Sequence, residues 1–594
     1  MVSEFGLNAL QVLQRRYLLR DKNGQIIESP TQLFRRVANA IAHAELNYEQ
    51  SVDINKIEDD FFEIMSNLEF LPNTPTLMNA GTSVGQLAAC FVVPVEDSLN
   101  GIFEAAKSTA LIHQTGGGTG FSFSRLRPQG DLVRSTEGRA SGPITFMTIF
   151  DKTTEVIKQG GKRRGANMGI LRVDHPDVLD FIQCKSKEGF LSNFNVSVAV
   201  TDDFMKAVKK NQNYNLINPR TNKVVRNLNA KYVFELISYN AWRTGDPGLI
   251  FIDEINRHNP TPQLGSIEAT NPCGEMPLLY WEACNLGSIN LAKIVENKKI
   301  NWARLKRLVE LGVRFLDNSI DTNKYPVAQI EKITKSNRKI GLGIMGFAEA
   351  LIQLGIPYDS SKALSLARRL MRFIKREGHA VSQKLGAERG SFTNFEQSVW
   401  KKKLRYKTMR NATVTTIAPT GTISIIANCS SGIEPLFAVS YIRNVMDNTE
   451  LIETNQYFEN VAKEEGFYSK KLMEEISRHG TIQHIKTIPK KIRQMFVTAH
   501  DISPSWHIRM QAVFQKYTDN AVSKTINLPY NAKQKEVSDA FWLAYKLKCK
   551  GITVYRYGSK PNQVLSFKQR TKQGVKTVAD SEFAGGCIGT VCPH

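Results

Sequence analysis

The chain begins with a pattern typical of helices. Residues 29–32 read Ser-Pro-Thr-Gln, which has the form of a capping box with proline at the first helical position. Leu33, Val37 and Ile41 then recur at four-residue spacing, as a single apolar helix face requires. The pattern predicts a helical N-terminal region over residues 1–70.

Beyond residue 70, short apolar runs alternate with amphipathic stretches. Runs rich in β-branched and aromatic residues, which are typical of strands, lie at 88–95, 196–200, 248–252, 413–417 and 551–555. Patterns typical of helices lie between them, at 232–242, 303–316 and 360–374. The alternation predicts an α/β architecture with a largely parallel sheet over residues 71–562.

The last stretch, residues 563–594, differs from the rest because it is polar and has little apolar periodicity. This pattern predicts a flexible tail, which carries Cys587 and Cys592 near the C-terminus. Exposed paired thiols on such a segment suit thiol–disulfide exchange, and a chance pair is the alternative.

Composition narrows the class of protein. Of 594 residues, 42% are hydrophobic and 23% are charged, an ordinary globular balance. Eight cysteines in so long a chain do not make a disulfide scaffold, and no Cys-x-x-Cys spacing suggests zinc, so we expect no metal site. No signal-peptide pattern opens the chain and no apolar run approaches a membrane span, so we expect a cytoplasmic protein.

The formal net charge is +22 at pH 7. Such a balance favours anionic partners, either nucleic acid or phosphorylated small molecules, and a solvated basic surface is the alternative. Lysine and arginine are spread along the chain without a long basic tail. This spread argues against a nucleic-acid binder that relies on one basic stripe.

The segment Asn271-Pro272-Cys273-Gly274-Glu275 carries the sharpest chemical signal. If it is extended, the three alternate side chains of Asn271, Cys273 and Glu275 face one site. A carboxylate there can take a proton from a hydroxyl that an amide orients, next to a sulfur. A structural cysteine in a Pro/Gly turn is the alternative.

Other candidates are weaker when taken singly. Cys90 and Cys284 each fit a buried strand cysteine that behaves as a small hydrophobe. The glycine run at 116–120 and the segment 418–424 would let backbone N–H groups approach a phosphate. Tight turns use the same residues, and neither segment matches the Walker A pattern.

Together these segments resemble the catalytic chain of ribonucleotide reductases. The resemblance runs from about residue 7 to the C-terminus, with the motifs in the family's order. The shared motifs are Pro72-Asn73-Thr74-Pro75-Thr76, the glycine run 116–120, the segment 271–275, Cys284-Asn285-Leu286-Gly287-Ser288, Pro419-Thr420-Gly421-Thr422, Gly432-Ile433-Glu434-Pro435 and the tail cysteines.

The resemblance implies a ten-stranded α/β barrel with a central finger loop. Cys273 on that loop would become a thiyl radical and abstract the ribose 3′ hydrogen, while Glu275 takes the 3′-hydroxyl proton and Asn271 holds the substrate hydroxyls. Cys90 and Cys284 would deliver two electrons and close into a disulfide as the 2′-hydroxyl leaves as water.

Further contacts are implied by the same resemblance. The ribonucleotide substrate would contact Thr74, Ala89, Gly118, Pro419, Thr420, Gly421, Thr422 and Ile423. Cys587 and Cys592 would reduce the buried disulfide and be regenerated by a thioredoxin-like partner.

A deoxynucleotide effector site is also implied, at Asp97, Ser98, Leu99, Arg127 and Arg134. Paired arginines suit its phosphates, and Asp97 could accept hydrogen bonds from its base or sugar. A solvated surface is the alternative for two arginines near a turn. Relatives form this site at a dimer interface, so the resemblance implies a homodimer, without nucleic-acid or membrane partners.

Three segments, at 116–121, 158–169 and 550–558, resemble the cobalamin-dependent group most, so adenosylcobalamin is the implied cofactor. Two-subunit reductases relay their radical through adjacent tyrosines, whereas Arg556 separates Tyr555 from Tyr557 here. There is no Asp-x-His-x-x-Gly motif, but this group binds cobalamin without that histidine. Diphosphate substrates are expected by resemblance. We expect no ATP-cone domain ahead of the helical region, and hence no on/off control by ATP and dATP.

Three alternatives remain open at this point. The first is the large subunit of a two-subunit, metal-dependent reductase. The second, a glycyl-radical reductase, lacks its Arg-Val-x-Gly-Tyr motif near the C-terminus. The third is a basic nucleic-acid-binding protein, which would explain the net charge without catalysis.

Overall fold

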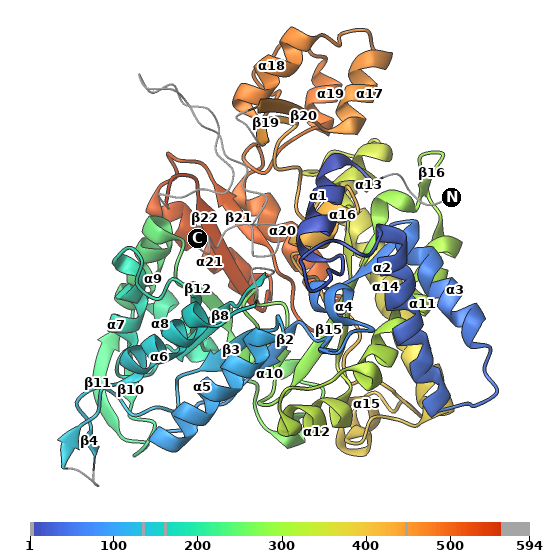
Figure 1. Cartoon of the computed structure of the whole chain (residues 1–594). Helices are drawn as coiled ribbons and strands as arrows, with labels where there is room; N and C mark the ends of the chain where they lie inside the picture. The colour runs from blue at the N-terminus through green and yellow to red at the C-terminus, as the bar shows by residue number, and fades with distance from the viewer. Residues whose placement is uncertain (1–4, 134–136, 160–162, 446–448, 560–594) are drawn as a thin grey trace.

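A computed structural model describes residues 5–133, 137–159, 163–445 and 449–559. The predictions for Arg134, Cys587 and Cys592 concern residues outside these ranges. Figure 1 shows N-terminal helices packed beside two long helices, a strand-rich centre, and a lobe that projects from one end.

The N-terminal region forms the predicted helices: α1 (Leu7–Arg16), α2 (Pro30–Ala42) and α3 (Ile54–Ser66). The capping box of α2 is present, because the Ser29 hydroxyl accepts from the Gln32 N–H and the Gln32 side chain accepts from the Ser29 N–H. Both bonds are local, which is why the sequence pattern alone predicted them.

These helices share one hydrophobic core with α11 (Trp302–Thr322) and α14 (Ser361–Arg389). The Phe315 ring lies 5.1 Å from that of Phe61 in α3 and 5.4 Å from that of Phe70, between ring centroids. The N-terminal helices are therefore packed directly onto the strand-rich part of the chain.

Ten of the described strands form one sheet. Their order is β1 (Phe70–Pro72), β15 (Ala283–Asn290), β2 (Cys90–Val92), β3 (Gly118–Ser122), β8 (Asn167–Arg172), β9 (Phe194–Val200), β12 (Gly248–Phe251), β22 (Gly551–Arg556) and β21 (Thr525–Leu528), with β18 (Ile340–Met345) paired to β15. Within this order, β2, β3, β8, β9 and β12 are parallel to one another. Antiparallel pairs join β2 to β15 at one end of this set and β12 to β22 at the other. Two parallel halves therefore meet along antiparallel seams.

The sheet closes into a barrel through irregular pairing. Isolated bridges join Leu342 to Thr415 and Ile417 to Val522, which links β18 through residues 413–417 to the residues just before β21. The predicted strand at 413–417 is thus reduced to bridges, because the N–H groups of Val414 and Thr415 bond to the Asp519 carboxylate. The predicted ten-stranded α/β barrel is confirmed.

Helices cover the first half of the barrel: α5 (Leu99–Gln114), α6 (Pro143–Val156), α9 (Ala230–Thr244) and α21 (Gln534–Lys546). They enclose a second core whose centre is aromatic, with Phe121 and Phe150 ring centroids 4.8 Å apart. The predicted helices at 232–242, 303–316 and 360–374 correspond to α9, α11 and α14, each longer than predicted.

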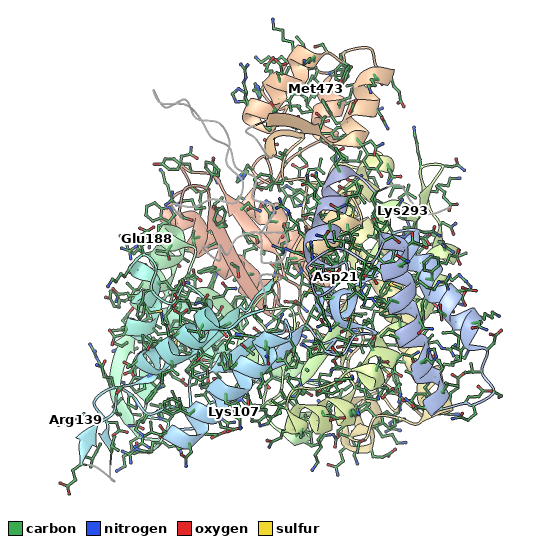
Figure 2. The ribbon with its side chains drawn as sticks, in the orientation of Figure 1. Asp21, Lys107, Arg139, Glu188, Lys293 and Met473 are labelled. Carbon is green, nitrogen blue, oxygen red and sulfur yellow. The ribbon has the colours of Figure 1, made fainter. Side chains whose placement is uncertain are left out.

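The projecting lobe consists of β19 (Ser440–Val445), β20 (Thr449–Thr454), α17 (Gln456–Glu464), α18 (Lys470–His479) and α19 (Lys490–Met495). Met473, labelled in Figure 2, lies in its small separate core. The sequence pattern did not predict this lobe.

In the described part of the chain, no helix has both the length and the apolar character needed to cross a bilayer.

Candidate active site

The finger loop, residues 271–276, joins two short paired strands, β13 (Ala269–Thr270) and β14 (Pro277–Leu278). Its tip is a tight turn, because the Gly274 N–H donates to the Asn271 carbonyl at 3.1 Å and Gly274 has a φ of 80°. The predicted extended conformation is therefore wrong. A turn with proline second and a left-handed glycine fourth replaces it.

The turn nevertheless gathers the polar groups onto a neighbouring strand. The Asn271 amide Nδ2 lies 3.2 Å from the Cys90 sulfur, and Glu275 Oε1 lies 4.0 Å from the same atom. Asn271 and Glu275 are both buried. An amide, a carboxylate and a thiol thus meet in a site sheltered from water.

Cys90 and Cys284 occupy directly opposed positions on the antiparallel strands β2 and β15. Both are buried and both are present as thiols. Opposed residues of antiparallel strands have Cα atoms about 4.5–5.5 Å apart, within the span that a disulfide tolerates. Burial raises the pKa of the Cys284 thiol well above its usual value, which keeps the proton on the sulfur. The pair can therefore act as a dithiol and close into a disulfide without moving the strands.

Cys273 is only half-buried and lines a cavity that is partly open to solvent. Small polar residues of the barrel strands line the same cavity, among them Asn195, Ser197 and Thr553. The cysteine at the tip of the finger loop thus faces a space that a ligand can enter.

Close packing against β3 holds the finger loop in place. A Cβ atom at Gly120 would lie 1.7 Å from the Thr270 carbonyl oxygen, and one at Gly118 would lie 3.0 Å from the Pro272 ring. Only glycine lets the backbones approach this closely. The buried glycines of β3 thus make room for the finger loop, and the interpretation of run 116–120 as a phosphate loop stays a prediction.

Hydrogen bonds fix the loop from the other sides. The Asn195 amide donates to the Pro272 carbonyl at 2.9 Å. The Glu275 carbonyl accepts from the Thr416 hydroxyl and from the Ala521 N–H, each at 2.9 Å. The finger loop is thus tied to both halves of the barrel.

The predicted substrate segment 419–423 opens a short helix, α16 (Gly421–Ile426), and Pro419 and Gly421 line the same cavity as Cys273. Thr420 has a φ of 57°, and its hydroxyl accepts from the Gly432 N–H at 2.8 Å. The Thr422 hydroxyl is buried and has no hydrogen-bond partner among the described residues. An unpaired buried hydroxyl on the residue that follows the cavity-lining Gly421 is suited to a ligand.

Two other predicted substrate residues, Thr74 and Ala89, lie outside the segment 419–423. Thr74 opens α4 (Thr74–Asn79), and its hydroxyl is 2.9 Å from that of Tyr17. Ala89 is partly buried and packs against the core that holds Cys90 and Cys284.

Sequence reasoning missed the charged residues of the cavity. Lys524 is fully buried and pairs with Glu434 at 2.5 Å, and both line the cavity with Lys550. Glu434 belongs to the shared motif at residues 432–435, but the sequence alone predicted no function for it. A lysine gives no local signal that it is buried, so only the fold reveals it.

Of the predicted effector residues, Asp97, Ser98 and Leu99 lie at the start of α5, and Arg127 contacts Asp97. The Arg127 guanidinium donates to both Asp97 carboxylate oxygens, at 2.9 and 3.1 Å, so this carboxylate already has a cationic partner. Ser98 caps α5 by accepting from the Gly101 N–H, and Leu99 is 64% exposed.

Among the described residues, no cluster of three or more His, Cys, Asp or Glu side chains could hold a metal ion.

A ten-stranded barrel with a finger-loop cysteine beside an opposed cysteine pair defines an enzyme whose chemistry uses thiols. Two family models match the chain: "Ribonucleotide reductase, all-alpha domain" over residues 3–85 and "Ribonucleotide reductase, barrel domain" over residues 88–555. The chain belongs to the ribonucleotide reductase family.

Alignments with similar proteins cover nearly the whole chain. A "Vitamin B12-dependent ribonucleoside-diphosphate reductase" of Thermoplasma acidophilum is 50% identical, over 94% of this chain and 80% of that protein. One of the same name from Mycobacterium tuberculosis is 47% identical, over 99% of this chain and 83% of that protein. Among solved structures, the "Actinobacillus ureae class Id ribonucleotide reductase alpha subunit" has the same fold, with a TM-score of 0.76 at 23% identity, over 93% of this chain and 97% of that one.

Proposed function

We propose that this chain is an adenosylcobalamin-dependent reductase that converts ribonucleoside diphosphates to deoxyribonucleoside diphosphates. The observation that carries the proposal is the convergence of Asn271 and Glu275 on Cys90, directly opposite Cys284. The names of relatives at 47–50% identity support the cofactor and the diphosphate substrate.

The residues divide the reaction between them. The Cys273 sulfur, as a thiyl radical, takes the 3′ hydrogen atom of the ribose, and Glu275 accepts the 3′-hydroxyl proton while Asn271 orients the substrate hydroxyls. Cys90 and Cys284 supply two electrons and two protons, the 2′-hydroxyl leaves as water, and a disulfide forms. Cys273 then returns the hydrogen atom to the 3′ carbon, and Glu275 returns the proton to the 3′ oxygen. The burial of Glu275 and of the Cys90–Cys284 pair suits this chemistry because bulk water is kept from the proton and electron transfers.

The cavity beside Cys273 suits the nucleoside end of the cofactor. Asn195, Ser197 and Thr553 offer hydrogen-bonding groups, and Gly248 and Gly551 also line the cavity. Adenosylcobalamin, when bound, would supply the radical that removes the hydrogen atom from the Cys273 thiol.

We assign the substrate contacts to Thr74, Ala89, Gly118 and the segment Pro419–Ile423, with Thr422 as a phosphate or sugar partner. Cys587 and Cys592 would carry electrons from a thioredoxin-like protein to the buried pair. Such thiol exchange needs a reducing compartment, so we place the reaction in the cytoplasm.

A homodimer with effector sites at its interface is the proposed assembly. Along α5, Leu99 and Phe103 lie four residues apart and are 64% and 55% exposed, and Val156 at the end of α6 is 68% exposed. An exposed apolar face on two packed helices fits a protein interface. The effector would then bind near Asp97, Ser98, Leu99, Arg127 and Arg134, at the edge of that interface.

The test is anaerobic conversion of CDP to dCDP by this chain with a small dithiol, with and without adenosylcobalamin. We expect product only with the cofactor. Folded protein that gives no product with CDP or CTP in either case would favour the large subunit of a two-subunit enzyme, which lacks its radical generator.

A further inference from the structure

Residues 519–521 form a short segment beside the finger loop that makes several hydrogen bonds to other parts of the chain. Its Ala521 N–H donates to the Glu275 carbonyl at 2.9 Å, and the Thr416 hydroxyl donates to the same oxygen at 2.9 Å. These bonds set where the Glu275 backbone lies, and through it where the carboxylate lies relative to Cys90. The position of residues 519–521 therefore sets the position of the proposed base.

One buried amine holds this segment from the cavity side. Lys550 Nζ donates to the Asp519 carbonyl and to the Asn520 carbonyl, each at 2.6 Å. Lys550 is 4% exposed and lines the same cavity as Cys273. Burial lowers the pKa of Lys550 to about 7, and the amine retains at least two N–H donors in either protonation state.

The side chain of Asp519 holds the segment from the opposite side. Its carboxylate accepts from His379 at 2.9 Å and from Lys375 at 3.0 Å, both on α14. It also accepts from the backbone N–H groups of Val414 and Thr415, at 3.1 and 3.3 Å. The segment is therefore clamped between α14 and the amine of Lys550.

We propose that Lys550 is a positioning residue for catalysis: its amine holds the carbonyls of Asp519 and Asn520, so that the Ala521 N–H holds the Glu275 carbonyl and aims its carboxylate. The inference rests on the proposed role of Glu275 as the base. Lys550 itself has no contact with the Cys90–Cys284 pair among the interactions described above, so its effect reaches the chemistry through the finger loop.

The test compares three variants of the full chain with adenosylcobalamin, a small dithiol and CDP. Lys550→Met keeps the length of the side chain and removes both donors. Thr416→Val removes the side-chain donor to the Glu275 carbonyl. Lys546→Met is the matched control, because Lys546 is an exposed lysine at the last residue of α21, four residues from Lys550.

Two rates are measured for each protein. The first is steady-state CDP reduction, separated into kcat and KM. The second is the loss of hydrogen label from the 5′ carbon of adenosylcobalamin to water, which needs radical transfer to Cys273 but no base. A general disturbance of the fold or of the cavity would lower both rates, whereas a misplaced Glu275 lowers only the first.

For Lys550→Met and Thr416→Val we expect kcat to fall about 10- to 100-fold, because a misplaced catalytic group costs that much. KM and label loss should stay within about two-fold of the wild type, and Lys546→Met should match the wild type throughout.

Full kcat in Lys550→Met would overturn the inference, as would a parallel fall of reduction and label loss. If Lys550→Met does not fold, Thr416→Val decides, and an unchanged kcat there refutes the positioning of Glu275 through its carbonyl, on which the inference depends. A wild-type chain that makes no product with the cofactor would instead refute the proposed function, and the role of Glu275 with it.

Discussion

Cys90 and Cys284 face each other across adjacent antiparallel strands, and the Asn271 amide lies 3.2 Å from the first of these sulfurs. Cys273, two residues along from Asn271, lines the cavity instead. The finger loop thus stands between a dithiol and a ligand space. This arrangement separates the cysteine that would carry the radical from the pair that would supply electrons.

That separation predicts that substitutions of Cys284 and of Cys273 affect the two measured rates differently. Cys284→Ser should lower CDP reduction more than about 1000-fold, because serine cannot form the disulfide, while label loss from adenosylcobalamin continues. Cys273→Ser should abolish both, because serine does not carry the radical. Measuring both rates anaerobically checks the prediction, with Cys184→Ser, outside the site, as the control. Label loss that persists in Cys273→Ser would remove that cysteine from its proposed role.

How much of this arrangement could be predicted depended on how local the determining contacts are. The capping box of α2 involves residues three apart, and Leu33, Val37 and Ile41 mark one helix face, so both could be read directly from the sequence. The identity of the finger-loop residues came from their motif. Their conformation was predicted wrongly, although Pro272 and Gly274 are the residues that a tight turn favours.

The missed features depend on distant parts of the chain. The burial of Lys524 and Lys550 is decided by how β21 and β22 close the barrel, and nothing beside either lysine indicates it. The strand at 413–417 was expected to be regular, but Asp519, about a hundred residues away, takes two of its N–H groups. Local patterns cannot reveal a competitor so far along the sequence.

The glycine at position 120 should be essential for the finger loop. Gly120→Ala would place a Cβ atom 1.7 Å from the Thr270 carbonyl oxygen, so the hairpin must shift. We expect CDP reduction to fall about 100-fold or more, since a displacement of about 1 Å costs that much. Steady-state assays of this variant and of Gly6→Ala, which meets no atom within 4 Å, make the comparison. Near-normal turnover in Gly120→Ala would contradict the packing described for β3.

The buried hydroxyl of Thr422 should act on substrate affinity. Thr422→Val keeps the shape of the side chain and removes a hydroxyl that has no hydrogen-bond partner among the described residues, so stability should not fall. If the hydroxyl binds a substrate phosphate, KM for CDP should rise about 10- to 100-fold while kcat changes little. Thr109→Val, which removes a buried hydroxyl bonded to the Ala105 carbonyl, is the control and should leave KM unchanged. An unchanged KM in Thr422→Val would exclude Thr422 from the substrate contacts.

Glu45 should make stability depend on pH. Burial raises the pKa of Glu45, but the Arg314 and Arg389 guanidinium groups, at 2.7 and 2.5 Å, outweigh burial and lower the pKa to about 2, from 4.5. A carboxylate whose pKa is depressed in the folded state stabilises that state above its unfolded pKa, and the contribution is lost as the pH falls toward the folded pKa. The shift corresponds to about 3 kcal/mol.

Glu45→Gln should therefore unfold at a lower urea concentration than the wild type at pH 7, with a free energy of unfolding smaller by about 3 kcal/mol. The difference should persist down to about pH 5 and shrink as the pH falls from there toward 2, because the wild-type carboxylate then becomes protonated as well. Glu49→Gln, an exposed glutamate four residues on, should show no such difference at any pH. Urea unfolding curves of the three proteins, followed by tryptophan fluorescence from pH 7 to pH 3, measure this. A deficit in Glu45→Gln that stays constant across that range would show that packing, and not the charge on Glu45, joins the N-terminal helices to α11 and α14.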